Sequence, residues 1–67
     1  MTTITVYEYP GYRVFGRFTA PTYTDVLRAA DRVMGTHYVV ENEGEWLFHF
    51  AKHPNQVFTV EVDEVES

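Results

Sequence analysis

Three aromatic side chains, Trp46, Phe48 and Phe50, stand at every second position of residues 45–51. Successive side chains of a β-strand point to opposite faces, so this spacing places all three rings on one face of a strand. The segment is the densest run of apolar bulk in the chain. We therefore expect a β-sheet whose core is built around residues 45–51.

Residues 56–62 alternate with the same period, and their apolar series is Phe58, Val60 and Val62. A turn that spans residues 52–56 would pair this strand with residues 45–51. The expected cross-strand pairs are Phe50 with Phe58, Phe48 with Val60, and Trp46 with Val62. Pairs of aromatic and β-branched side chains stabilise sheets. All six side chains are therefore predicted to line one surface of the core.

A helix is predicted over residues 23–34, where apolar residues follow the spacing of a single helical stripe. The stripe consists of Tyr23, Val26, Leu27, Ala30, Val33 and Met34. Thr22 and Asp25 form an approximate capping box at the start of this helix, and Gly35 is suited to end it.

Turn residues divide the rest of the chain into strands. Pro10-Gly11 and Asn42-Glu43-Gly44 are typical of turns, and Gly16 indicates a bulge or a close approach of the helix. Strands are predicted at residues 3–9, 12–19 and 36–41. With the segments above, the order is ββαβββ, which predicts an α+β fold. The expected architecture is a five-stranded, mainly antiparallel sheet with an interior first strand and one helix packed on one face.

Length and charge restrict the function. The 67 residues predict a single domain, residues 1–67, with a frayed acidic tail at residues 63–67. Five basic residues stand against ten acidic ones, giving a net charge of −5. Direct binding of nucleic acid is not expected, because phosphate neutralisation needs clustered Lys and Arg. No apolar run approaches the roughly 20 residues that span a bilayer, and we expect a cytoplasmic protein of a host bacterial cell without a cofactor.

The chain offers little for catalysis. Its histidines are His37, His49 and His53, and the single serine is the last residue. His37 and His49 could face one another across neighbouring strands with Glu41 nearby, as a metal or acid–base cluster. The alternative is that the two histidines occupy a half-exposed sheet face. No catalytic motif is present, so we expect a protein that is not an enzyme and has no metal site.

Carboxylates gather in two parts of the sequence. Glu41, Glu43 and Glu45 surround one turn, and a second group lies near the C-terminus: Glu61, Asp63, Glu64 and Glu66. The strand pairing proposed above would bring Glu45 close to Asp63 and join the groups into one acidic edge. Such an edge could occupy a basic groove by imitating a phosphate backbone. The alternative is solvated surface charge that prevents unwanted pairing at the sheet edge.

Tyrosines flank the first turn and mark a second candidate surface. Tyrosine is over-represented at interface hot spots, although these side chains could equally be ordinary strand residues. Together with the acidic groups, the residues predicted to contact a partner are Glu41, Glu43, Glu45, Asp63, Glu64, Tyr7, Tyr9, Tyr12 and Phe15.

From Thr22 to Val62 the chain resembles small phage-encoded anti-CRISPR proteins of ββαβββ topology. The similarity lies in the helix over residues 23–34, the strand after Gly35, the Asn42-Glu43-Gly44 turn and the Trp46-Leu47 strand. The resemblance implies a non-enzymatic inhibitor that binds a host CRISPR effector complex and blocks its handling of DNA. It assigns no functional residue here, and only Lys52 is available for members that use lysine patches. The alternative is a structural or accessory phage or bacterial domain that forms a homodimer.

Overall fold

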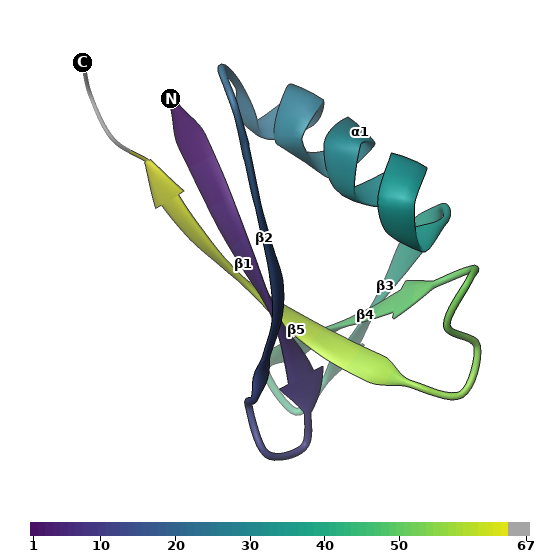
Figure 1. Ribbon diagram of the computed structural model, residues 1–67. Helices are drawn as coiled ribbons and strands as arrows, with labels where there is room; N and C mark the ends of the chain where they lie inside the picture. Colours follow the sequence, from purple (N-terminus) through teal and green to yellow (C-terminus); the bar gives the residue numbers. More distant parts are fainter. Residues whose placement is uncertain (65–67) are drawn as a thin grey trace.

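The computed structural model describes residues 1–64, and it contains the predicted α+β fold: one antiparallel five-stranded sheet and one helix (Figure 1). Residues 65–67 of the predicted acidic tail lie outside the described part. The elements in chain order are β1 (Thr2–Tyr9), β2 (Val14–Ala20), α1 (Tyr23–Met34), β3 (His37–Asn42), β4 (Glu45–Phe50) and β5 (Val57–Glu64).

The strand order across the sheet is β2-β1-β5-β4-β3, and every neighbouring pair is antiparallel. The prediction that β1 is interior is confirmed, because β1 pairs with β2 on one side and β5 on the other. The β1–β2 pairing shifts where Val6 lies opposite Gly16 and Tyr7 lies opposite Val14. Phe15 is the extra residue at this bulge, so the bulge indicated by Gly16 is confirmed.

Helix α1 has the predicted bounds. The Thr22 side chain accepts a hydrogen bond from the backbone N–H of Asp25 at 3.2 Å, and Gly35 ends the helix with φ +91°. The buried stripe is narrower than predicted, since Tyr23 and Val33 are 41% and 62% exposed. The reason is that α1 lies mainly over β1 and β2, at one edge of the sheet, and not over the strands at the other edge.

The core lies between α1 and the sheet. Its buried residues are Ile4, Val6, Val26, Ala30, Met34, Phe48, Phe50 and Phe58. Phe48 and Phe50 are buried as predicted, but the assignment of Trp46 to the core is wrong, because 64% of its surface is exposed.

The predicted register between β4 and β5 is also wrong. Phe48, rather than Phe50, lies opposite Phe58. At the end of β4, the next two residues bond to the residue before β3 and to the last residue of α1. The N–H groups of Ala51 and Lys52 donate to the carbonyls of Thr36 and Met34, both at 3.0 Å. These bonds keep the end of β4 beside β3, so the loop to β5 starts from a different place.

Strand β5 is longer than predicted. Asp63 and Glu64 belong to β5 and pair with Thr3 and Thr2 of β1, so these two residues are not part of a frayed tail. No helix of the described residues is long and apolar enough to cross a membrane.

Candidate binding surfaces of the β3–β4 hairpin

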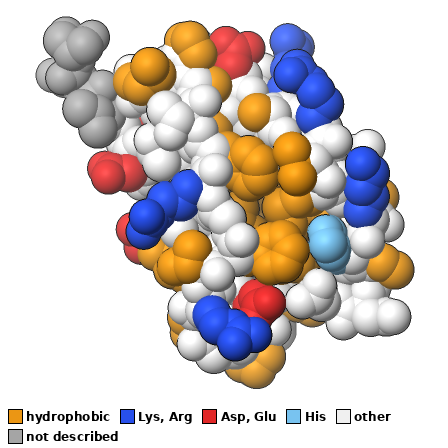
Figure 2. Space-filling view, viewed as in Figure 1, with side chains coloured by type: hydrophobic (Ala, Val, Ile, Leu, Met, Phe, Trp, Pro, Cys, Tyr) orange, Lys and Arg blue, Asp and Glu red, His pale blue; other side chains and the backbone are white. Residues whose placement is uncertain are grey.

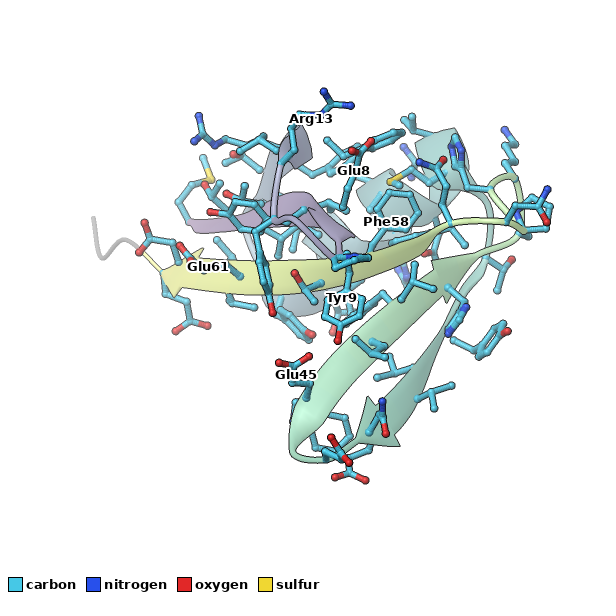
Figure 3. All side chains as sticks on the ribbon, turned by 90° about the horizontal axis from the view of Figure 1, so that it is seen from below. Glu8, Tyr9, Arg13, Glu45, Phe58 and Glu61 are labelled. Atoms are coloured by element: carbon cyan, nitrogen blue, oxygen red, sulfur yellow. The ribbon has the colours of Figure 1, made fainter. Side chains whose placement is uncertain are left out.

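The β3–β4 hairpin leaves the plane of the other three strands. It meets β5 where Phe48 lies opposite Phe58, and Figure 3 shows β4 diverging from β5 on one side of this crossing. The hairpin therefore presents one face toward the helix side of the sheet and the other toward the side without a helix. Each face carries a candidate binding surface.

The first surface is an apolar groove of about 420 Å³ on the helix side. Its lining residues come from the first turn of α1 and from β3, β4 and β5: Tyr23, Val39, Trp46, Phe48, Val60 and Val62. Phe48 is only 7% exposed, whereas Trp46 and Val62 remain 64% and 45% exposed. The groove is thus a solvent-accessible continuation of the core that no element of the described chain covers.

Carboxylates stand near both ends of this groove. Glu41 lies directly opposite Trp46 across the hairpin, so both side chains emerge on the same face. Glu64 lies two residues beyond Val62 and shares its face for the same reason of alternation. The segment that supplies most of the groove is also acidic as a whole: residues 36–64 contain six carboxylates and, apart from histidines, a single basic residue, Lys52.

Basic residues are concentrated elsewhere. All four arginines precede residue 36, in the segment that forms β1, β2 and α1. Figure 2 shows a face on which lysine and arginine side chains surround an apolar patch beside α1. Charge is therefore segregated between the arginine-bearing half of the molecule and the acidic half that contains the hairpin.

The second surface, which we call the Tyr–Glu corner, consists of Tyr9, Tyr12 and Glu45. The two tyrosine rings are perpendicular, with an interplanar angle of 88° and centroids 5.9 Å apart. The Tyr12 hydroxyl donates a hydrogen bond to Glu45 Oε1 at 3.4 Å. Figure 3 shows Tyr9 of β1 and Glu45 of β4 pointing toward one another. The corner thus joins two hairpins that are far apart in sequence.

The negative charge of Glu45 alters the pKa of Tyr9. The negative charge of Glu45 is the main cause that raises the pKa of Tyr9 above its usual 10.0, followed by partial burial and a hydrogen bond to Glu45. Tyr12 and Glu43 raise the same pKa further. A tyrosinate would meet repulsion here, and a cation would be attracted.

Two tight turns position the corner. Between β1 and β2, the N–H of Tyr12 donates to the Glu8 carbonyl and the N–H of Glu8 donates to the Arg13 carbonyl, both at 2.8 Å. Tyr12 itself has a φ of +57°. Between β3 and β4, the N–H of Gly44 donates to Glu41 Oε1 at 3.0 Å, which fixes the turn immediately before Glu45.

The structure places the other predicted contact residues in separate regions. Tyr7 is partly buried in β1, and Phe15 is 39% exposed while its ring packs on Phe58 with centroids 5.0 Å apart. The pairing that was predicted to bring Glu45 to Asp63 is not formed, because β4 and β5 meet in a different register. Glu45 contacts Tyr12 instead.

His37 and His49 do not form the metal or acid–base cluster considered from the sequence. His37 lies opposite Phe50, and its Nδ1 is 2.6 Å from Asp31 Oδ1 of α1. His49 lies opposite Tyr38 and stacks on it, so it faces the other side of the hairpin. Among the described residues, no group of three or more His, Cys, Asp or Glu side chains could hold a metal ion.

The apolar groove was missed because alternation alone assigned Trp46 and Val62 to the core. One signal could have revealed it. A helix is about 10 Å wide and strands lie about 4.8 Å apart, so a single short helix covers only two or three strands of a five-stranded sheet.

Comparison of the chain with protein families, with curated proteins and with solved structures found no significant match.

Proposed function

We propose that this protein is a small non-enzymatic interaction protein that binds a basic, partly apolar surface of a host protein or nucleoprotein complex. The observation that carries this proposal is the uncovered apolar groove on the acidic half of the molecule. By its resemblance to anti-CRISPR proteins, the partner is a CRISPR effector complex, and the protein is an inhibitor encoded by a phage or another mobile element.

Trp46 is the expected anchor of the complex. Tryptophan is among the residues most enriched at interface hot spots, where a large ring fills a pocket of the partner. Here the ring is 64% exposed beside Val39 and Val62, which are also exposed. Burying these side chains under a partner would remove apolar surface from water and supply much of the affinity.

The charge of the partner follows from the charge of this half of the protein. Glu41 and Glu64 flank the groove, and none of its lining residues is basic. A partner with Lys and Arg around an apolar contact is complementary to this arrangement and would associate quickly. CRISPR effector complexes hold nucleic acid in positively charged channels, so a protein that occupies such a channel would block nucleic acid without any chemical step.

The proposal is tested by measuring affinity for purified CRISPR effector complexes. Trp46→Ala should weaken binding at least tenfold, since truncating a hot-spot residue costs about 2 kcal/mol or more. Tyr38→Ala is the matched control, because Tyr38 is a similarly exposed aromatic on the opposite face of the hairpin. Equal effects of the two changes, or no effect of either, would contradict docking through the groove.

The acidic contribution is tested separately. The pair Glu41→Gln and Glu64→Gln removes the two carboxylates that flank the groove, so it should slow association and make it less sensitive to salt. Asn55→Lys with Gln56→Lys is the control, since it changes the net charge by the same amount in an exposed loop at the other end of the hairpin. If the control slows association equally, net charge rather than this acidic region governs binding.

A homodimer is the second candidate, and the edge strand β3 favours it. Tyr38, Val39 and Val40 are 61%, 40% and 41% exposed, and among the described residues β3 pairs only with β4. Two antiparallel β3 edges centred on Val39 would place Tyr38 opposite Val40 and His37 opposite Glu41 of the other copy. Sedimentation at low micromolar concentration distinguishes the candidates: a monomer disfavours the dimer, and a dimer that Val40→Lys dissociates supports it.

A further inference from the structure

We infer that the Tyr–Glu corner is a binding site for the guanidinium group of an arginine side chain presented by a protein partner. The corner combines two aromatic walls with a carboxylate, which are the two kinds of group that recognise a guanidinium. It lies on the opposite face of the hairpin from the apolar groove, so it is a separate site.

The carboxylate of Glu45 has capacity for a second ligand. An ionised carboxylate can accept about four hydrogen bonds. Tyr12 donates one of these to Oε1, and its length of 3.4 Å makes it a weak bond. The hydrogen bond between Tyr9 and Glu45 accounts for a second, so acceptor positions of the carboxylate remain. A guanidinium offers two parallel N–H donors in the geometry of a carboxylate and would form shorter, charge-assisted bonds with Glu45.

The tyrosine rings supply the second contact. Because Tyr9 and Tyr12 are perpendicular with centroids 5.9 Å apart, they bound a corner from two sides. A planar guanidinium can stack on one ring face while its edge points at the carboxylate. The rings enclose a ligand from only two sides, which suits a flat group better than a round quaternary ammonium that is held by an aromatic cage.

The local field favours a cation. Glu43, in the adjacent turn, and Glu45 both raise the pKa of Tyr9, which shows that their charges reach this position. Arg13, which follows Tyr12 in the sequence, does not compete for Glu45. Arg13 forms an ion pair with Glu8 at 3.3 Å, and Figure 3 shows both on the opposite side of the ribbon from Tyr9 and Glu45.

The claim that a protein partner supplies the arginine rests on the proposed function, which requires a basic protein surface. The claim that the corner binds a guanidinium group does not rest on the proposed function, because an isolated arginine derivative can test it. The probe is N-acetyl-arginine amide, titrated into the ¹⁵N- and ¹³C-labelled protein and followed by NMR. The matched ligands are N-acetyl-citrulline amide, which has the same shape without the charge, and N-acetyl-lysine amide with a free ε-amino group.

We expect saturable shifts of Tyr9, Tyr12 and Glu45 signals with the arginine compound, weaker ones with lysine and none with citrulline. Glu45→Gln and Tyr9→Leu should each weaken arginine binding about threefold, the range of exposed ion pairs and cation–π contacts. Tyr9→Phe keeps the ring and loses only the hydrogen bond to Glu45, so it should bind arginine more tightly than Tyr9→Leu does. Trp46→Ala, on the other face of the hairpin, should leave arginine binding unchanged.

Equal shifts with citrulline, equal affinity for lysine, or arginine binding that Glu45→Gln does not weaken would each overturn the assignment. The backbone spectrum of every variant reports whether the fold is retained. Failure of the arginine probe would leave docking through the groove intact, because that proposal is tested by Trp46→Ala against a purified complex. Failure of that complex to bind would likewise leave the result of the arginine titration standing.

Discussion

Phe48 of β4 lies directly opposite Phe58 of β5, and among the described residues this is the one registered pair between the two strands. The pair attaches the β3–β4 hairpin to the rest of the sheet. Phe58 is fully buried, and its ring also packs edge-to-face against Phe50 and Phe15, with centroids 5.5 and 5.0 Å away. One aromatic side chain therefore connects the hairpin, the core and the β2 bulge.

Phe58→Ala should destabilise the protein by about 3–5 kcal/mol, because it removes a buried ring and leaves a cavity. A chain of this length has a total stability of about 3–10 kcal/mol, so the change should remove roughly a third of this stability or more. Circular dichroism with urea unfolding measures the change. Trp46→Ala is the control and should cost about 0.5 kcal/mol or less, since most of that ring is exposed.

The sequence allowed the elements and their order to be predicted because each one depends on local periodicity. The bounds of α1 followed from this local information, whereas the interior position of β1 was predicted from the strand directions that the ββαβββ order allows. The β4–β5 register followed from neither, because it depends on the hydrogen bonds of Ala51 and Lys52 to the segment that enters β3. Alternation fixes the face of the sheet that each side chain occupies. It does not fix the cross-strand partner, because shifting the pairing register by two residues leaves every side chain on the same face.

Gly35→Ala should destabilise the protein by at least about 2 kcal/mol. Gly35 has φ +91° and ψ 168°, a region that is nearly restricted to glycine. An added Cβ would also lie 2.8 Å from the backbone nitrogen of Lys52 and 3.0 Å from Ala51 Cβ. The measurement is the midpoint of thermal or urea unfolding.

Gly44→Ala separates these two effects. Gly44 has a similar φ of +86°, but an added Cβ there would meet no atom within 4 Å. This variant should lose about 1 kcal/mol from the unfavourable backbone conformation. If Gly35→Ala costs no more than Gly44→Ala, the close packing between the end of α1 and the β4–β5 loop is not a constraint on the fold.

A double-mutant cycle on Asp31 and His37 should show a coupling of about 1 kcal/mol. Their side chains meet at 2.6 Å in a partly buried position and connect α1 to β3, and a hydrogen bond of this kind contributes about that amount. The variants are Asp31→Ala, His37→Ala and the combination, compared by urea unfolding. The Glu8–Arg13 pair provides the reference: its Arg13 side chain is 83% exposed, so its coupling should be about 0.5 kcal/mol or less.

The candidate site could be predicted only in its components. Composition and position indicated Tyr9, Tyr12 and Glu45 as contact residues, but Tyr12 and Glu45 are separated by 33 positions in sequence. Their meeting depends on the angle at which the β3–β4 hairpin leaves β5 (Figure 3). That angle results from the packing around Phe48 and Phe58 and has no signature in local periodicity.

The pKa of Tyr9 gives the last prediction. Because this pKa is raised above 10.0 in the folded protein, the folded state holds the Tyr9 proton more tightly than the unfolded chain does. The associated stability is fully present below pH 10.0 and is lost as the pH rises through the folded-state pKa. Glu45→Gln removes the largest cause, so Tyr9 should titrate closer to 10.0 and the loss of stability at alkaline pH should be smaller. Glu61→Gln is the control, since Glu61 is not among the groups that raise this pKa. The Tyr9 ring signals in an NMR pH titration measure the effect, and equal titration curves for the two variants would contradict the contact between Glu45 and Tyr9.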